Sequence, residues 1–284
     1  MYPSRRGGAR VGSILRAMPK AVWQPNELAT DPHRNGEKAD KVRDMFASIA
    51  GAYDMNNRVH SFGLDQHWRR AAVRLAGVRP MDDVVDVACG TGDLTELFAR
   101  SGVRSVVGID FTPPMLDIAR LKSAKESGRE GGATARGGVA RVQPTYVAGD
   151  AMALALPDAS VDVLSIAFGL RNVSDPAKAL SEFRRVLRPG GRLIVLEFDE
   201  PRNGLVRAAN RLYTHHIMPW TASLLARDRS GAYRYLPRSV ETFLDRTRLR
   251  RAILAAGFAT VEQQDLTFGT CVLSRGTVAS GRIG

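Results

Sequence analysis

The stretch VVDVACGTGDLT, residues 84–95, decides how the fold is interpreted. Its apolar run is typical of a buried strand, its glycines of a tight turn, and the residues from Asp93 of a helix. Strand, glycine turn and helix in succession form the nucleotide-binding unit of parallel sheets. A dinucleotide fingerprint needs a third glycine, but that position is Thr95, and Asp93 would compete with a phosphate at the helix N-terminus. The stretch therefore favours a ligand without phosphate.

Acidic residues end two further apolar strands. Asp110 ends VVGID, 18 residues after Gly92, and Asp150 ends VAGD. Because the carboxyl ends of parallel strands meet at one edge of a sheet, both acids should lie near the glycine turn, with Asp110 on ribose hydroxyls and Asp150 near an adenine. Each acid alone is typical of a turn or helix cap, but together they indicate a nucleoside site. The cationic sulfonium and ammonium of S-adenosylmethionine suit nearby carboxylates, so it is the predicted cofactor.

Apolar strands alternate with helix-length segments from residue 83 to residue 198. This alternation predicts βαβ units, and hence an α/β fold with a parallel sheet and right-handed crossovers. The last part of the chain reads as two more strands around a turn near Thr267–Gly269.

The chain divides into a core and four peripheral segments. Residues 1–36 contain Gly, Pro and Arg without apolar periodicity, which predicts a disordered basic extension. Residues 37–276 are expected to form a single domain, with a flexible insert at 122–143 and a helical substrate cap at 201–245. Residues 277–284 are expected to be a tail.

The net charge of +12 over 284 residues is unevenly distributed. Residues 1–36, 122–143 and 200–251 carry net charges of +4, +3 and +7, which leaves −2 for the rest of the chain. A nearly neutral core argues against a continuous face that follows nucleic-acid phosphates, so no nucleic-acid partner is expected. The late region is basic and partly apolar, so it would suit an anionic membrane surface. The alternative is that its arginines are simply solvated by water.

The two cysteines, Cys89 and Cys271, are too few for a disulfide framework and lack metal-ligand spacing. We therefore expect no metal site and a reducing, cytoplasmic location. The sequence has no apolar run of membrane-spanning length, so any membrane contact would be peripheral, at the inner face. Whether the chain forms a homodimer stays open.

Several segments resemble a known family. DVACGTGDL, VVGID and AGDAMALALPDASVDVL resemble the motifs of a class I, Rossmann-like S-adenosylmethionine-dependent methyltransferase. The segments at 53–70 (YDMNNRVHSFGLDQHWRR), 168–180 (FGLRNVSDPAKAL) and 185–201 (RVLRPGGRLIVLEFDEP) resemble the signatures of the C-methyltransferases of ubiquinone and menaquinone biosynthesis. The resemblance extends over residues 38–276. The chain departs from that family's pattern at Asn56, where Met is usual, and at Asp199, where Ser is usual.

The resemblance implies a mostly parallel seven-stranded sheet with an antiparallel terminal strand and helices on both faces. It also implies C-methylation of a lipophilic demethylated quinol, foremost demethylmenaquinol to menaquinol. Another small lipophilic acceptor or the benzoquinol precursor of ubiquinone is the alternative, and RNA a weaker one. A nucleotide-linked oxidoreductase and an inactive scaffold are further rivals. The first is weakened by Thr95 and the second by the retained glycines and Asp110.

The candidate site residues follow from these motifs. Arg171 and Asn172 of FGLRN are the candidate catalytic residues. Arginine holds its proton too tightly to act as a base, so Arg171 is expected to stabilise a phenolate or a bound hydroxide. The alternative for Arg171 is a structural salt bridge. The candidate cofactor-binding residues are Tyr53, Asp86, Gly90, Thr91, Gly92, Asp110, Asp150, Ala151 and Ala167.

Overall fold

The computed structural model describes residues 22–130, 141–217 and 231–281. They contain a seven-stranded sheet of order β3-β2-β1-β4-β5-β7-β6. Its strands are β1 (Asp83–Val87), β2 (Ser105–Asp110), β3 (Thr145–Ala148), β4 (Val161–Ala167), β5 (Leu187–Phe198), β6 (Thr260–Leu266) and β7 (Cys271–Thr277). Neighbouring strands pair in parallel, except that β7 is antiparallel to both β5 and β6. The predicted Rossmann-like α/β fold is confirmed, with the last strand of the chain inserted beside the edge.

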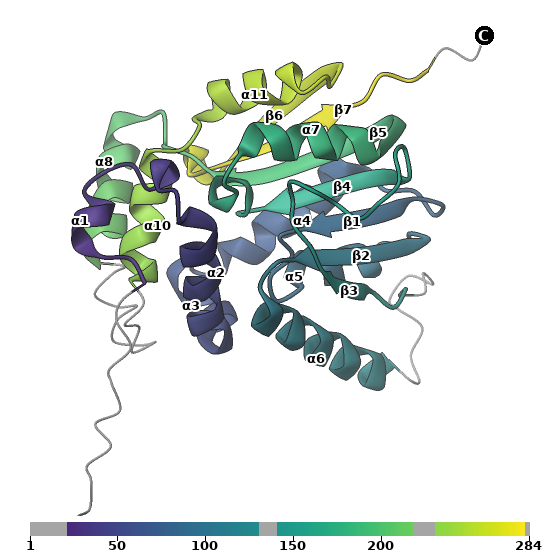
Figure 1. Cartoon of the computed structure of the whole chain (residues 1–284), viewed down its shortest axis with the longest axis horizontal. Coiled ribbons are helices and arrows are strands. Elements are labelled where there is room, and N and C mark those ends of the chain that lie inside the picture. Colours follow the sequence, from purple (N-terminus) through teal and green to yellow (C-terminus); the bar gives the residue numbers. More distant parts are fainter. Residues whose placement is uncertain (1–21, 131–140, 218–230, 282–284) are drawn as a thin grey trace, which may run out of the picture.

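Helices cover both faces of the sheet and gather beyond one of its ends (Figure 1). The α-helices are α1 (Pro25–Leu28), α2 (Lys38–Ile49), α3 (Tyr53–His60), α4 (Leu64–Ala76), α5 (Asp93–Ala99), α6 (Pro113–Glu130), α7 (Pro176–Val186), α8 (Gly204–Leu212), α10 (Ala232–Glu241) and α11 (Arg246–Ala255). Short 3₁₀ or π segments are η1 (Pro32–Arg34), η2 (Ala50–Ala52), η3 (Leu170–Asn172), η4 (Tyr213–Ile217) and η5 (Thr267–Gly269). Among the described residues, none of the helices has both the length and the hydrophobicity needed to cross a bilayer.

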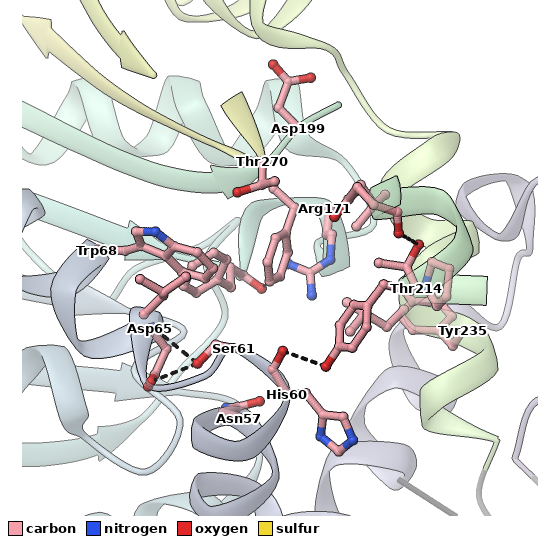
Figure 2. A pocket seen from close by; sticks show the side chains of 18 of the residues that line it. Asn57, His60, Ser61, Asp65, Trp68, Arg171, Asp199, Thr214, Tyr235 and Thr270 are labelled. Carbon is pink, nitrogen blue, oxygen red and sulfur yellow. Dashed lines mark hydrogen bonds between the residues drawn. The ribbon is translucent and has the colours of Figure 1, made fainter. Parts of the chain in front are cut away.

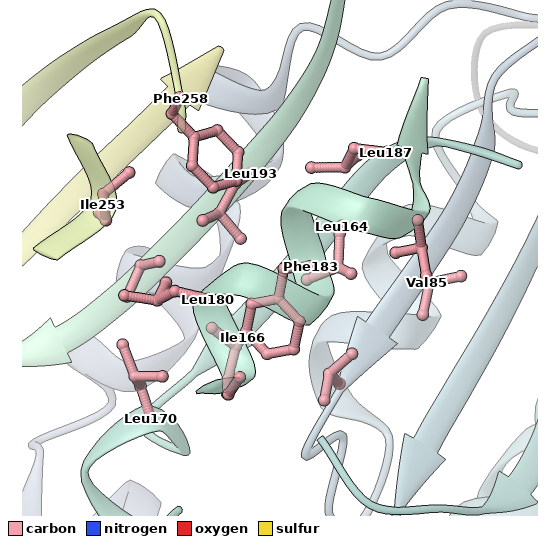
Figure 3. Packing of buried hydrophobic residues seen from close by; sticks show 14 of the residues in the cluster. Val85, Leu164, Ile166, Leu170, Leu180, Phe183, Leu187, Leu193, Ile253 and Phe258 are labelled. Atoms are coloured by element: carbon pink, nitrogen blue, oxygen red, sulfur yellow. The ribbon is translucent and has the colours of Figure 1, made fainter. Parts of the chain in front are cut away.

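The core lies on both faces of the central strands, because successive strand residues point to opposite sides. On one face Val85 and Leu164 pack in the same cluster as Phe183 of α7 (Figure 3). On the other face Val84 and Val163 join the residues of α4 and α5. All five side chains are buried, and burying a Val, Leu or Phe side chain contributes about 1.5–3 kcal/mol. This two-sided core holds the carboxyl ends of the strands at fixed positions.

Residues 22–36 differ from the predicted disordered extension, since they are ordered in α1 and η1. The Trp23 side chain is fully buried and stacks on the Tyr235 ring of α10, with ring centroids 4.8 Å apart. One large aromatic side chain thus fixes a segment that has no apolar periodicity. Residues 1–21 of the predicted extension lie outside the described residues.

The other predicted segments have different bounds in the structure. Residues 122–130 of the predicted insert continue helix α6, while 131–140 lie outside the described residues. The predicted helical cap contains α8, η4 and α10, with 218–230 outside the described residues. The predicted tail starts too early, because Thr277 still belongs to β7 and Val278 is buried against the core.

Candidate functional site

The glycine turn joins β1 to α5 at the carboxyl edge of the sheet. Gly90 and Gly92 have φ angles of +56° and +84°, in the left-handed region that favours glycine. A side chain at Gly92 would also meet the Tyr146 hydroxyl, 2.6 Å from a built Cβ. At the place of the third fingerprint glycine, the Thr95 hydroxyl donates to Asp86 Oδ2 over 2.7 Å. The side chain at 95 therefore locks the helix to its strand, where a pyrophosphate-binding turn would have glycine.

Asp86 is buried inside the sheet and lines neither of the two cavities described below. Its carboxylate accepts hydrogen bonds from the hydroxyls of Thr95 and Ser165, the latter over 2.6 Å. Burial raises the pKa of Asp86 to about 6, against the lowering effect of these two hydroxyls. Asp86 thus joins β1, β4 and α5 beneath the turn, and its role as a cofactor contact stays a prediction.

Asp110, at the end of β2, lies beside the glycine turn. Its Oδ2 accepts from the Gly90 backbone N–H and its Oδ1 from the Thr112 N–H, both over 2.8 Å. Burial raises the pKa of Asp110, and the backbone N–H groups of Gly90 and Thr112 oppose the shift. Each carboxylate oxygen keeps a second lone pair, which suits a ribose diol whose two hydroxyls both donate.

A cavity of about 120 Å³ opens at this edge. The predicted residues that line it are Tyr53, Gly90, Asp110, Asp150, Ala151, Ala167 and Asn172. Thr91 and Gly92 belong to the turn and Asp86 belongs to β1, and none of the three lines this cavity. The lining of this cavity combines carboxylates from two strand ends with apolar Met115 and Met152, and its described residues include no basic side chain. It therefore fits the uncharged nucleoside of S-adenosylmethionine better than it fits a phosphate.

Asp93 is neutralised from within the chain. It accepts a short hydrogen bond from the Lys122 ammonium and another, of 3.3 Å, from Arg58. Burial raises the pKa of Asp93, but the neighbouring cations, chiefly Lys122, bring it below its usual value. The argument from sequence that the ligand itself supplies the opposing charge is therefore corrected, because Lys122 of α6 supplies it.

Thr91 connects the turn to helix α3. Its hydroxyl donates to Asp54 Oδ1 over 2.5 Å, and Lys122 donates to Asp54 Oδ2 over 2.7 Å. Asp54 thus ties the start of α3 to the glycine turn and to α6. Tyr53, the neighbouring residue, lines the cavity at the sheet edge.

A second, larger cavity of about 310 Å³ lies next to the first (Figure 2). Its apolar and aromatic lining includes Met45, Phe46, Ile49, Tyr53, Phe62, Trp68, Phe168, Phe198, Tyr213, Tyr235 and Leu236. Arg171 and Asp199 also reach it. Three side chains, Phe46, Tyr53 and Phe168, line both cavities and form a shared wall between them.

Phe168, in this wall, has a strained backbone conformation. It is a non-glycine residue with a φ of +57°, and its ring lies 4.5 Å from the Phe198 ring. Such backbone conformations cost about 1–3 kcal/mol and cluster at functional sites. The next residue, Gly169, is close to the glycine turn, because a Cβ there would lie 2.6 Å from Ala88 Cβ. Glycine at 169 therefore lets the FGLRN loop approach the β1 turn.

Arg171 forms a buried ion pair with Glu197 of β5. Its Nη1 donates to Glu197 Oε1 over 2.7 Å and to the Phe168 carbonyl over 2.6 Å. The guanidinium also lies over the Phe198 ring, 5.2 Å from its centroid. The buried Nε has no hydrogen-bond partner among the described residues. Arg171 thus makes the structural salt bridge that was its alternative role, while its side chain also lines the larger cavity.

The FGLRN loop is held from behind by Lys38 of α2. The Lys38 ammonium donates to the carbonyls of Arg171 and Val173, over 2.8 and 2.6 Å, and lies 3.0 Å from His33 Nδ1. His33 Nε2 faces the Ser239 carbonyl, so it carries the proton and Nδ1 accepts from Lys38. Burial lowers the pKa of Lys38 to about 8, against the opposite effect of Asp31.

Asn172 faces the smaller cavity rather than the larger. Its Nδ2 donates to the Phe168 carbonyl over 3.2 Å, and its Oδ1 accepts from the Tyr235 hydroxyl over 3.0 Å. Both bonds fix the loop between the two cavities, which suits a positioning role. The structure thus brings together Arg171, Asn172, Tyr53, Asp110 and Asp150, and sets Asp86, Thr91 and Gly92 behind them.

Sequence reasoning missed Lys38, Tyr235 and Glu197. Glu197 carried a signal, since it is a lone acid in the apolar run GRLIVLEF and needs a buried cationic partner. Lys38 and Tyr235 carried none, because their partners lie 133 and 63 residues away. Among the described residues, no group of three or more His, Cys, Asp or Glu side chains is arranged to hold a metal ion.

Comparison with solved structures supports the fold. An S-adenosylmethionine-dependent methyltransferase from Thermotoga maritima superposes with a TM-score of 0.55 at 19% identity, over 82% of this chain and 98% of that one. One from Aquifex aeolicus gives 0.52 at 17% identity, over 74% and 89% of the two chains.

Comparison of sequences is more specific. The chain is 44% identical to the demethylmenaquinone methyltransferases of Deinococcus radiodurans and Thermus thermophilus, over 82% of this chain and 92% and 99% of theirs. It is 40% identical to the ubiquinone/menaquinone biosynthesis C-methyltransferase UbiE of Teredinibacter turnerae, over 86% of this chain and 93% of that one. The model of the ubiE/COQ5 methyltransferase family matches residues 34–278. With this match over most of its length, the chain belongs to the ubiE/COQ5 methyltransferase family, and its cofactor is S-adenosylmethionine.

Proposed function

We propose that this enzyme methylates a ring carbon of a lipophilic demethylated quinol, foremost demethylmenaquinol. The main observation in support of this function is the pair of cavities that share a wall made of Phe46, Tyr53 and Phe168. One cavity suits a nucleoside and the other is large, apolar and aromatic. The relatives named as demethylmenaquinone methyltransferases support this acceptor.

The cofactor, when bound, supplies an electrophilic methyl group on a sulfonium. The chain aligns the acceptor with it and excludes water. The aromatic rings of Trp68, Phe168 and Phe198 provide an apolar site for a quinol ring. A bound acceptor displaces water from this site, so charges beside it interact more strongly.

Arg171 is the proposed stabiliser of the ionised quinol. A ring carbon becomes nucleophilic when the neighbouring hydroxyl loses its proton, and the oxygen then carries negative charge. Because Glu197 already balances the charge of Arg171, the guanidinium acts mainly as a directed hydrogen-bond donor, through N–H groups that Glu197 and the Phe168 carbonyl leave unused. Glu197 holds the donor in place, since a buried and oriented dipole needs no reorganisation during the reaction.

Replacing Arg171 by Lys tests this role while it leaves a cation beside Glu197. Lysine keeps the charge but loses the planar fork, so we expect kcat to fall about 100-fold while cofactor affinity stays within about threefold. Turnover with reduced demethylmenaquinone and labelled S-adenosylmethionine measures the first, and calorimetry measures the second. Wild-type turnover by this variant would reject the role of Arg171.

The acceptor itself is tested with two quinols. Reduced demethylmenaquinone and a reduced demethylated benzoquinone precursor of ubiquinone are assayed in parallel with the full chain. Faster turnover of the naphthoquinol supports the proposal, and faster turnover of the benzoquinol assigns the alternative acceptor. Methylation of neither quinol would reject the proposed function. We also propose that the enzyme meets its lipophilic acceptor at a membrane surface.

A further inference from the structure

Helix α8 carries an apolar stripe that faces solvent. Leu205, Ala208, Ala209 and Leu212 recur at the i, i+3, i+4, i+7 spacing of one helix face, and all four are exposed. Leu205 is 81% and Leu212 59% exposed, and no residue of α8 is buried. In a soluble globular helix such a stripe normally faces the core, so its exposure indicates an external partner.

Two exposed phenylalanines extend this stripe at its ends. Phe268 of η5, 81% exposed, lies near the start of α8, because a Cβ at the adjacent Gly269 would be 3.6 Å from Pro201 Cα. Phe62, 77% exposed, lies near the end of α8, where its ring is 5.7 Å from the Tyr213 ring. Both have positive φ angles, +57° and +53°, so the backbone is strained where each aromatic ring meets solvent.

These residues stand at the rim of the larger cavity. Phe62, Arg211, Tyr213 and Thr267 line that cavity, and they belong to the same three segments that carry the exposed apolar side chains. We name the set of Phe62, Leu205, Ala208, Ala209, Leu212 and Phe268 the rim surface. A molecule that covers the rim surface therefore sits directly beside the cavity.

Basic side chains accompany the rim surface. On and before α8, Arg202, Arg207 and Arg211 alternate with the apolar stripe. Arg202 and Arg211 are exposed and each pairs with one acid, Asp265 and Glu200 respectively. The combination of a basic surface and an apolar stripe complements an anionic bilayer.

We propose that the rim surface docks on an anionic lipid bilayer, so that a lipophilic acceptor passes from the lipid into the larger cavity. The destination of the acceptor rests on the proposed function, whereas the docking rests on the exposed stripe and its charge. A second copy of the chain is the competing occupant. Arg202, Arg207 and Arg211 would lie near their own images across a two-fold interface through this surface, and that repulsion favours the bilayer.

The test is sedimentation of the full chain with lipid vesicles. One set contains neutral phosphatidylcholine alone, and the other about 30% anionic phosphatidylglycerol, since the attraction scales with anionic lipid. The double variant Leu205→Asp/Leu212→Asp places charge on the stripe. Leu121→Asp on α6 is the matched control, because Leu121 is 62% exposed and far from the rim surface in the sequence.

We expect the wild-type chain and the Leu121→Asp control to bind the anionic vesicles equally, more tightly than neutral ones. The double variant should bind at least about tenfold more weakly, and added salt should weaken wild-type binding. Equal binding by the double variant, or no wild-type binding, would overturn the proposal. Loss of a dimer in light scattering with unchanged vesicle binding would assign the surface to a second copy instead.

The acceptor assays separate this inference from the proposed function. Vesicle binding is measured without substrate. The docking proposal can therefore be supported even if neither quinol is methylated. A short-tailed quinol that dissolves in water reports whether the reaction centre is intact in the double variant. If docking delivers the acceptor, the double variant loses turnover of a long-tailed quinol in vesicles by at least about tenfold more than turnover of the soluble one.

Discussion

Lys38 offers a test of how the N-terminal region acts on the reaction centre. Replacement of Lys38 by Met keeps the stem and removes the ammonium that donates to the carbonyls of Arg171 and Val173. These carbonyls belong to the loop that holds Arg171 and Asn172 between the cavities. The variant therefore removes two hydrogen bonds that support the loop, while the residues that line the two cavities stay the same.

Two opposing contributions set the size of the effect. Each buried acceptor left without a donor costs about 1–3 kcal/mol. Against this, burial lowers the pKa of Lys38 from 10.5 to about 8, so the charged form is disfavoured by about 3 kcal/mol in the folded state. The two carbonyls together cost about 2–6 kcal/mol, and removal of the buried charge offsets about 3 kcal/mol of this. The net loss of stability near neutral pH is therefore at most about 3 kcal/mol, and the variant should fold.

The pH dependence gives the sharper signature. Between the folded pKa of about 8 and the unfolded value of 10.5, the unfolded chain binds the proton of Lys38 more fully than the folded chain. Stability from this residue therefore rises as the pH increases through that window. For these two pKa values the gain is about 2 kcal/mol between about pH 7 and about pH 9.5. This gain should be missing in Lys38→Met.

Urea unfolding at the two pH values measures the stability, and steady-state turnover measures the loop. We expect kcat of Lys38→Met to fall about tenfold, while cofactor affinity changes less, because Arg171 loses its support. Lys41→Met is the control, since Lys41 lies on the same helix but pairs with Glu27. An equal pH response in wild type and Lys38→Met, or unchanged kcat, would refute the reasoning.

Two further changes test other parts of the structure. Asp110→Asn puts an amide donor where Gly90 and Thr112 both donate, so calorimetry should show S-adenosylmethionine binding weakened by more than about tenfold; unchanged affinity would remove Asp110 from the ribose site. Asn56→Met removes a buried amide that has no hydrogen-bond partner among the described residues, so chemical denaturation should show a gain of about 1–3 kcal/mol. A loss of stability would show that the Asn56 amide is solvated or paired.

The sheet edge was predictable because it depends on local pattern. Apolar runs predict strands, and the carboxyl ends of parallel strands must gather, so Gly90, Asp110 and Asp150 could be placed together from their spacing alone. Arg171 and Asn172 could be placed near them because FGLRN follows the next strand. The pattern of apolar strands predicts which residues lie at the sheet edge, but it does not predict which cavity each of them faces.

The remaining parts depend on packing between distant segments. Trp23 on Tyr235, and Lys38 on the FGLRN loop, join residues that are more than a hundred positions apart. No periodicity marks such pairs, because a single side chain supplies each contact. For the same reason Asp93 was interpreted as facing a cationic ligand, whereas Lys122, 29 residues away on another helix, is its partner.

Because Phe46, Tyr53 and Phe168 form a shared wall, a ligand in either cavity contacts side chains that also line the other cavity. A ligand that orders these rings in one cavity spares the second ligand part of the entropy of ordering them. The resulting cooperativity is reciprocal, so the factor by which the cofactor tightens acceptor binding equals the factor by which the acceptor tightens cofactor binding. A mutation in any of the three rings therefore changes that common factor, even where it leaves either affinity alone unchanged.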